Sequence, residues 1–138
     1  MQKIIINTDG GARSNPGPAG IGVVIADEAG KPLKEFGEYI GEATNNVAEY
    51  QALIRALEEV GKTVSLSEAH VEIRMDSELV VRQMQGLYKV KEPTLKQKFL
   101  RVKELLTKIP NFSFVHVRRE QNKRADELVN EAIDNTGK

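Results

Sequence analysis

The 138-residue sequence contains no cysteine, no tryptophan and only two histidines. Without cysteine the chain forms no disulfide and no thiolate metal site, and two histidines make a zinc centre improbable. Any metal ion would therefore be held by carboxylates, which favour Mg²⁺ or Mn²⁺.

Long apolar runs are also missing. No stretch approaches the ~20 apolar residues of a membrane-spanning helix, and charged or polar residues interrupt every apolar run, so no signal peptide is predicted. With 40% apolar and 29% charged residues, the composition is typical of a soluble globular protein. We expect one domain over residues 1–138, acting as a cytoplasmic monomer away from membranes.

The charges balance to zero overall but are unevenly distributed. Residues 82–124 carry 12 Lys or Arg against 3 Asp or Glu. This excess favours contact with a polyanion such as nucleic acid, although a solvated helix face has the same composition.

Hydrophobic periodicity predicts strands and helices in the order βββαβααβα. Strands are expected at 3–9, 20–27, 32–40, 70–75 and 112–117, and helices at about 46–61, 77–84, 93–109 and 125–133. Helices between the later strands imply parallel crossover connections. The expected fold class is therefore α/β: a five-stranded mixed sheet, made of a three-strand antiparallel meander plus two parallel strands, flanked by helices.

The stretch IIINTDGGARSNPGPAGIGVVI, residues 4–25, places Asp9 in an otherwise apolar strand. A buried carboxylate needs a partner or a cation, whereas an Asp-Gly pair can simply start a turn. Three further acids arise at comparable places: Asp76 directly after the fourth strand, and Glu49 and Asp126 in the first turns of two helices.

Each acid has an ordinary alternative, since acids in first turns complement the helix dipole and Asp76 has the residue type of a cap. If the first and fourth strands are parallel neighbours, however, all four meet at one edge of the sheet. Crowded carboxylates repel unless cations neutralise them. Such a ligand set suits two divalent ions, and hence phosphoryl transfer or phosphodiester hydrolysis.

Four ordered motifs carry these acids: TDGGARSNPGPAGIGVVI (8–25), ATNNVAEYQALIRAL (43–57), MDSELVVRQM (75–84) and EQNKRADELVNEA (120–132). Together they resemble type 1 ribonuclease H over nearly the whole chain. The resemblance implies a ribonuclease H-like fold and an endonuclease that hydrolyses the RNA strand of RNA/DNA hybrids, leaving 5′-phosphate and 3′-hydroxyl ends. It also implies two Mg²⁺ or Mn²⁺ ions held by the catalytic residues Asp9, Glu49, Asp76 and Asp126.

The resemblance further implies which residues contact the hybrid, whose RNA strand is marked by its 2′-hydroxyls. Close backbone approach to the groove is implied for Gly10, Gly11 and Ala12, contact with the RNA strand for Asn46 and Glu49, and a phosphate-binding pocket for the DNA strand for Asn15, Thr44 and Asn45. The ordinary alternatives are a tight strand end for the glycines and helix capping for Asn45 and Asn46.

The chain departs from the family pattern in three places. The segment 86–98 is too short for the basic helix and loop of many bacterial members, so Lys89, Lys91, Lys96 and Lys98 are candidate substitutes, and binding is expected to be weaker and more salt-sensitive. His116 has the spacing of a catalytic histidine but falls on a strand, where packing is the alternative, and Arg119 is an electrostatic candidate for the scissile phosphate. Glu78 stands where a base-contacting glutamine is common.

Four functions remain open at this point. Besides the hybrid-specific nuclease they are a non-catalytic nucleic-acid binding module, a nuclease for double-stranded RNA, and an integrase or exonuclease on the same fold. The four acids, the NPGP turn and the TNN-xx-E pattern favour the hybrid-specific nuclease, with double-stranded RNA as a side substrate.

Overall fold

Three consecutive strands form the antiparallel part of the sheet in this computed structural model, which describes residues 1–136. They are β1 (Gln2–Ala12), β2 (Gly17–Asp27) and β3 (Pro32–Ala43). Tight connections at 13–16 and 28–31 join them, and the second connection closes with a hydrogen bond from the Lys31 backbone N–H to the Asp27 carboxylate. This meander confirms the expected one.

Two further strands pair in parallel, which gives the sheet order β3-β2-β1-β4-β5. β4 (Ala69–Met75) lies beside β1, and β5 (Phe112–His116) lies beside β4. Helix α1 (Asn45–Thr63) and the short 3₁₀ turn η1 (Leu66–Glu68) lead into β4, while α2 (Glu78–Met84) and α3 (Pro93–Leu106) lead into β5. A second 3₁₀ turn, η2 (Arg119–Gln121), precedes α4 (Lys123–Asp134). The predicted element order and mixed sheet are therefore confirmed.

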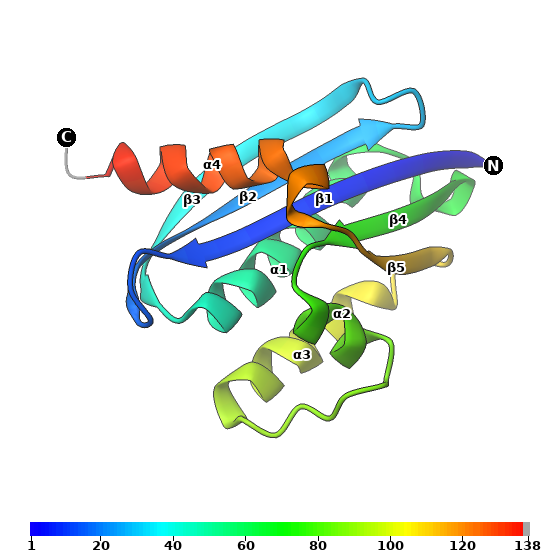
Figure 1. Ribbon diagram of the computed structural model, residues 1–138. Helices are drawn as coiled ribbons and strands as arrows, with labels where there is room; N and C mark the ends of the chain where they lie inside the picture. The colour runs from blue at the N-terminus through cyan, green and yellow to red at the C-terminus, as the bar shows by residue number, and fades with distance from the viewer. Residues whose placement is uncertain (137–138) are drawn as a thin grey trace.

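The helices cover both faces of the sheet (Figure 1). On one face the buried Ile4 and Ile6 of β1 belong to the same apolar core as Leu53 of α1 and Val102 of α3. On the other face α4 lies across β2 and β3. Its approach requires glycine, because a Cβ at Gly22 would lie 2.1 Å from the Ala125 carbonyl oxygen.

The first strand is longer than the sequence predicted. Its pairing with β2 continues to Ala12 opposite Ala19, while its pairing with β4 stops at Thr8 opposite Met75. The expectation that Asp9 ends its strand is therefore wrong. Asp9 lies instead one residue beyond the last pair of β1 with β4, where β1 is paired only with β2.

Other boundaries shifted by a few residues. α3 ends at Leu106 rather than near 109, and β5 ends at His116. No helix within residues 1–136 combines the length and apolarity needed to cross a membrane.

Candidate functional site

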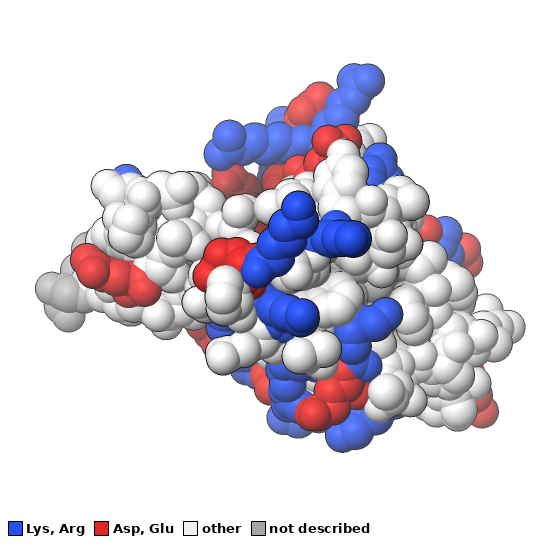
Figure 2. Space-filling view, turned by 90° about the horizontal axis from the view of Figure 1, so that it is seen from below, with Lys and Arg blue, Asp and Glu red and all other residues white. Residues whose placement is uncertain are grey.

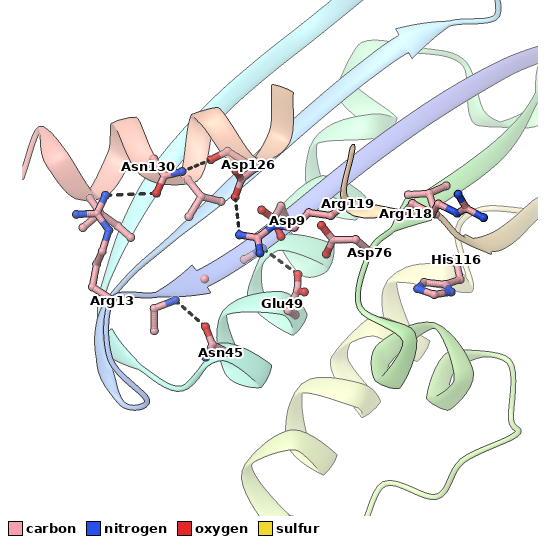
Figure 3. A pocket seen from close by; sticks show the side chains of 16 residues that line it. Asp9, Arg13, Asn45, Glu49, Asp76, His116, Arg118, Arg119, Asp126 and Asn130 are labelled. Atoms are coloured by element: carbon pink, nitrogen blue, oxygen red, sulfur yellow. Dashed lines mark hydrogen bonds and ion pairs between the residues drawn. The ribbon is translucent and has the colours of Figure 1, made fainter. Parts of the chain in front are cut away.

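Three carboxylates, from β1, from α1 and from the residue that follows β4, meet at the carboxyl end of β4. One oxygen each from Asp9 of β1, Glu49 of α1 and Asp76 lies within 4.8 Å of the other two. Asp126 of α4 lines the same cavity, whose volume is about 500 Å³. Figure 3 shows the four side chains converging from separate elements. The structure thus brings together all four acids that the sequence singled out.

Glu49 is held by the strand that carries Asp9. Its Oε1 accepts a hydrogen bond from the Gly10 backbone N–H at 2.8 Å. A Cβ at Gly10 would lie 2.2 Å from the carbonyl carbon of Ala48, so only glycine lets α1 come this close to β1. Because α1 begins at Asn45, Glu49 is not in its first turn. That expectation is wrong, and the helix dipole does not explain this acid.

Asp76 is not a helix cap. The neighbouring Ser77 caps α2, since its Oγ accepts a hydrogen bond from the Val80 backbone N–H at 3.3 Å. The Asp76 carboxylate is therefore not used for capping. Its Oδ2 accepts a long hydrogen bond, 3.4 Å, from the Asn122 side-chain amide.

Asp126 lies in the first turn of α4, as predicted. The guanidinium of Arg119 stands near it, with Nη2 at 3.9 Å from the Asp126 Oδ1. The Arg119 side chain is 81% exposed, so it is free to turn toward an anionic ligand in the cavity. Its position beside the acids agrees with the electrostatic role considered from the sequence.

Two of these acids, Asp9 and Glu49, resist ionisation. Burial, followed by the charges of Asp76 and Asp126, raises the pKa of Asp9 to about 8, while Arg119 lowers it. Burial and the charges of Asp9 and Asp76 likewise raise the pKa of Glu49 well above its usual value, against the opposing Gly10 N–H. Divalent cations remove this repulsion. An all-oxygen donor set of this kind fits Mg²⁺ or Mn²⁺.

A second cavity opens at the start of α1 and is lined by Asn15, Thr44, Asn45 and Asn46 among others. Asn45 ties it to β1: its backbone N–H donates to the Asn15 Oδ1 and its own Oδ1 accepts from the Ala12 backbone N–H, both at 2.9 Å. Thr44, not Asn45, is the N-cap, with its Oγ1 accepting from Val47 at 3.2 Å. Capping therefore explains neither Asn45 nor Asn46, which correspond to the first two helical residues.

The cavity lined by the four acids, the acidic cavity, is also lined by Gly10, Gly11 and Ala12. A Cβ at Gly11 would meet only the Val129 Cγ1, at an ordinary 3.6 Å. Packing thus demands glycine at position 10 but not at position 11.

Of the remaining candidates, one lines the acidic cavity and the other does not. His116 lies on β5, as the sequence indicated, but is its last residue, and its exposed side chain lines the acidic cavity. Glu78 is exposed at the start of α2 and lines neither of the two cavities.

The basic candidates lie on or before α3. Lys89 and Lys91 are exposed in the 85–92 connection, which a buried chain of hydrogen bonds anchors: Tyr50 OH donates to the Gln83 Oε1 at 2.5 Å, and the Gln83 Nε2 donates to the Lys89 carbonyl at 3.3 Å. Lys96 is exposed, while Lys98 is bound to the Gln51 side chain of α1. Figure 2 views the molecule from the side where α3 lies, and Lys and Arg side chains are spread over that face with acidic ones among them.

Four polar residues at or beside the cavity were not predicted from the sequence. Arg13, Arg118 and Asn130 line the acidic cavity, and Asn122 is buried behind it. Arg13 binds α4 through Asp134, at 2.8 Å. All four lie in or near the recognised motifs. Arg13, Asn122 and Asn130 make side-chain contacts across 46 or more residues of sequence, which no local pattern encodes.

Comparison with known proteins gives consistent matches. The protein family described as reverse transcriptase-like matches residues 7–132. The structure of ribonuclease H1 from the archaeon Halobacterium salinarum is 42% identical, covers 97% of this chain and 99% of its own, and superposes with a TM-score of 0.92. The LC11 ribonuclease H1, isolated from compost, was solved in complex with an RNA/DNA hybrid; it is 65% identical over 95% of this chain and 96% of its own, with a TM-score of 0.89.

The curated relatives are longer. The Halobacterium salinarum ribonuclease HI is 45% identical over 126 residues, which are 91% of this chain but 62% of the relative. A bifunctional protein of Mycobacterium tuberculosis is 42% identical over 134 residues, which are 96% of this chain and 36% of the relative. The chain therefore spans less than two thirds of these proteins.

Proposed function

Because this chain belongs to the type 1 ribonuclease H family, we propose that it is an endonuclease that hydrolyses the RNA strand of RNA/DNA hybrids. The products carry 5′-phosphate and 3′-hydroxyl ends. The observation that carries the proposal is the convergence of the Asp9, Glu49 and Asp76 carboxylates within 4.8 Å, with Asp126 on the same cavity.

Asp9, Glu49, Asp76 and Asp126 hold two Mg²⁺ or Mn²⁺ ions in this proposal. Bound divalent ions would supply an activated water and charge stabilisation at the departing oxygen. The chain contributes the placement of the ligands: Asp9 comes from a sheet strand, Glu49 is fixed by the Gly10 N–H, and Asp76 is released from capping by Ser77. Arg119 supplies positive charge for the scissile phosphate, and His116 stands on the same cavity for proton transfer or product release.

The hybrid is held by backbone and neutral polar groups. Gly10, Gly11 and Ala12 let the minor groove approach the acids, while Asn46 and Glu49 face the RNA strand. Asn15, Thr44 and Asn45 bind a phosphate of the DNA strand, a contact that positions a duplex without reading its sequence. The complex of the 65% identical LC11 ribonuclease H1 with an RNA/DNA hybrid supports this substrate class.

The 85–92 connection adds weaker contacts through Lys89 and Lys91, and Glu78, at the start of α2, contacts a base edge. In this proposal residues 1–138 act as one domain, in the cytoplasm and as a monomer. The monomer agrees with a site whose four acids all come from one chain. Double-stranded RNA is a side substrate in this proposal. The uncharged side chains that bind a phosphate of the DNA strand can bind the corresponding phosphate of a second RNA strand as well.

The test is a panel of end-labelled duplexes of one sequence: RNA/DNA hybrid, double-stranded RNA and double-stranded DNA. Each is incubated in Mg²⁺, in Mn²⁺ and with chelator. Fastest cleavage of the hybrid's RNA strand, with products that a 5′-phosphate-dependent exonuclease degrades, is expected. Tight hybrid binding without cleavage in either metal would leave only a binding module.

A further inference from the structure

Asn122 is the N-cap residue of α4, yet its side chain does not cap that helix. An asparagine at this position normally accepts a hydrogen bond from a backbone N–H in the first helical turn. Here the side chain, in a residue only 1% exposed, turns away from its own helix and reaches across to the sheet. This buried amide therefore hydrogen-bonds to groups outside its own helix.

The side chain joins three groups around the acidic cavity. Its Nδ2 donates to the Thr8 carbonyl oxygen at 2.8 Å, and its Oδ1 accepts from the Asn7 Nδ2 at 3.0 Å. Both partners precede Asp9 on β1. The same Nδ2 points its other hydrogen at the Asp76 Oδ2, 3.4 Å away.

The orientation of this amide is determined by its surroundings. A carbonyl oxygen only accepts hydrogen bonds, so the atom facing Thr8 must be the nitrogen. The second hydrogen of that nitrogen is then available to the Asp76 carboxylate. An aspartate at position 122 would present oxygen to both groups, so an amide is the functional group that satisfies all three contacts.

The backbone of Asn122 adds a fourth link. Its carbonyl accepts the first hydrogen bond of α4, donated by the Asp126 backbone N–H at 3.1 Å. One residue therefore connects the strand before Asp9, the Asp76 carboxylate and the helix turn that carries Asp126.

We propose that Asn122 is a positioning residue for the metal ligands: it orients the Asp76 carboxylate and sets the place of Asp126 relative to Asp9. This inference rests on the proposed function, because the acids must bind divalent ions for their orientation to matter. Groups that orient metal ligands typically contribute about 10–100-fold to metal affinity or activity.

The test measures Mg²⁺ binding calorimetrically in the full chain without nucleic acid, for the wild type, Asn122→Ala, Asn122→Ser and Asn7→Ala. We expect Asn122→Ala to weaken Mg²⁺ binding by about 10–100-fold. Asn122→Ser, which keeps one donor, should recover part of the loss. The matched control Asn7→Ala loses the same amide–amide hydrogen bond but keeps the Asp76 contact, so its Mg²⁺ affinity should stay within about twofold.

Hybrid cleavage provides a second readout. Asn122→Ala should lower kcat and raise the Mg²⁺ concentration needed for half-maximal rate, while KM for the hybrid stays near the wild-type value. In the wild-type chain, the Asn122 side-chain amide signals in the NMR spectrum should shift on Mg²⁺ titration, and those of the distant Asn111 should not. This last measurement needs no variant and holds even if Asn122→Ala does not fold.

Each outcome decides a separate point. Wild-type Mg²⁺ affinity in Asn122→Ala, an equal loss in Asn7→Ala, or an Asn122 amide signal that ignores Mg²⁺ would overturn the positioning role while leaving the nuclease intact. Absence of Mg²⁺ binding and cleavage in the wild type would instead overturn the proposed function.

Discussion

The backbone N–H of Gly10 donates to the Glu49 carboxylate at 2.8 Å, so the residue next to Asp9 fixes the acid contributed by α1. This contact exists because β1 and α1 touch without an intervening side chain at position 10. Two of the proposed metal ligands, Asp9 and Glu49, are thereby kept side by side at one glycine, where β1 and α1 pack together.

Gly10→Ala should destabilise the chain strongly, because its Cβ would lie 2.2 Å from backbone atoms of Ala48. We expect the free energy of unfolding to fall by about 3 kcal/mol or more. Gly11→Ala is the matched control, since its Cβ meets only a side-chain carbon at 3.6 Å; its effect should stay within about 0.5 kcal/mol. Denaturant unfolding of both variants checks this, and equal losses would contradict the packing account.

The sequence predicted the element order, the mixed sheet and the four converging acids. Hydrophobic periodicity is a local pattern that gives the order of strands and helices, and this order implies which strands are parallel. It misplaced features that depend on contacts between distant segments. Asp9 lies inside β1 because the pairing of β1 with β2 extends further along the strand than its pairing with β4. The buried role of Asn122 likewise arises only when residues 115 positions apart meet at Asn7.

Mg²⁺ should stabilise the folded chain, since the acids repel one another without it. At a metal concentration one hundred times the dissociation constant, linkage gives about 2.7 kcal/mol. Thermal unfolding with Mg²⁺ and with chelator measures the gain. The Asp9→Asn variant serves as the control, and a gain as large in that variant would show that Mg²⁺ acts elsewhere.

With chelator present, the free energy of unfolding should fall as pH rises from about 4 to about 8. Burial and the neighbouring Asp76 and Asp126 raise the pKa of Asp9 to about 8 in the folded chain, whereas the unfolded value is 3.8. Between these values the folded state binds more protons than the unfolded state, so rising pH favours unfolding. Burial raises the pKa of Glu49 in the same direction.

Asp9→Asn removes one of these groups and should flatten the pH dependence while raising stability near pH 8. Denaturant midpoints measured in chelator across this pH range test the effect for both chains. A wild-type stability that rises with pH over the same interval would contradict the crowded-acid account.

Replacing Lys89 and Lys91 with alanine should weaken hybrid binding and reduce its salt dependence. If each contacts one phosphate, the slope of log K against log salt concentration should shrink by about 1 per lysine. Lys108→Ala, two residues beyond the C-terminal end of α3, removes a lysine elsewhere and serves as the control, which should leave the slope unchanged. Fluorescence anisotropy at several salt concentrations gives both slopes, and identical slopes in all variants would remove the 85–92 connection from the binding surface.

The most direct measurement is single-turnover cleavage of the labelled RNA strand of a hybrid by the wild type and by Asp9→Asn, each with Mg²⁺ and with chelator. The account predicts cleavage by the wild type in Mg²⁺ alone, with Asp9→Asn reduced to the level of the chelator control although it still folds and binds the hybrid. Cleavage by Asp9→Asn at the wild-type rate, or by the wild type in chelator, would show that the four-acid centre does not perform the reaction.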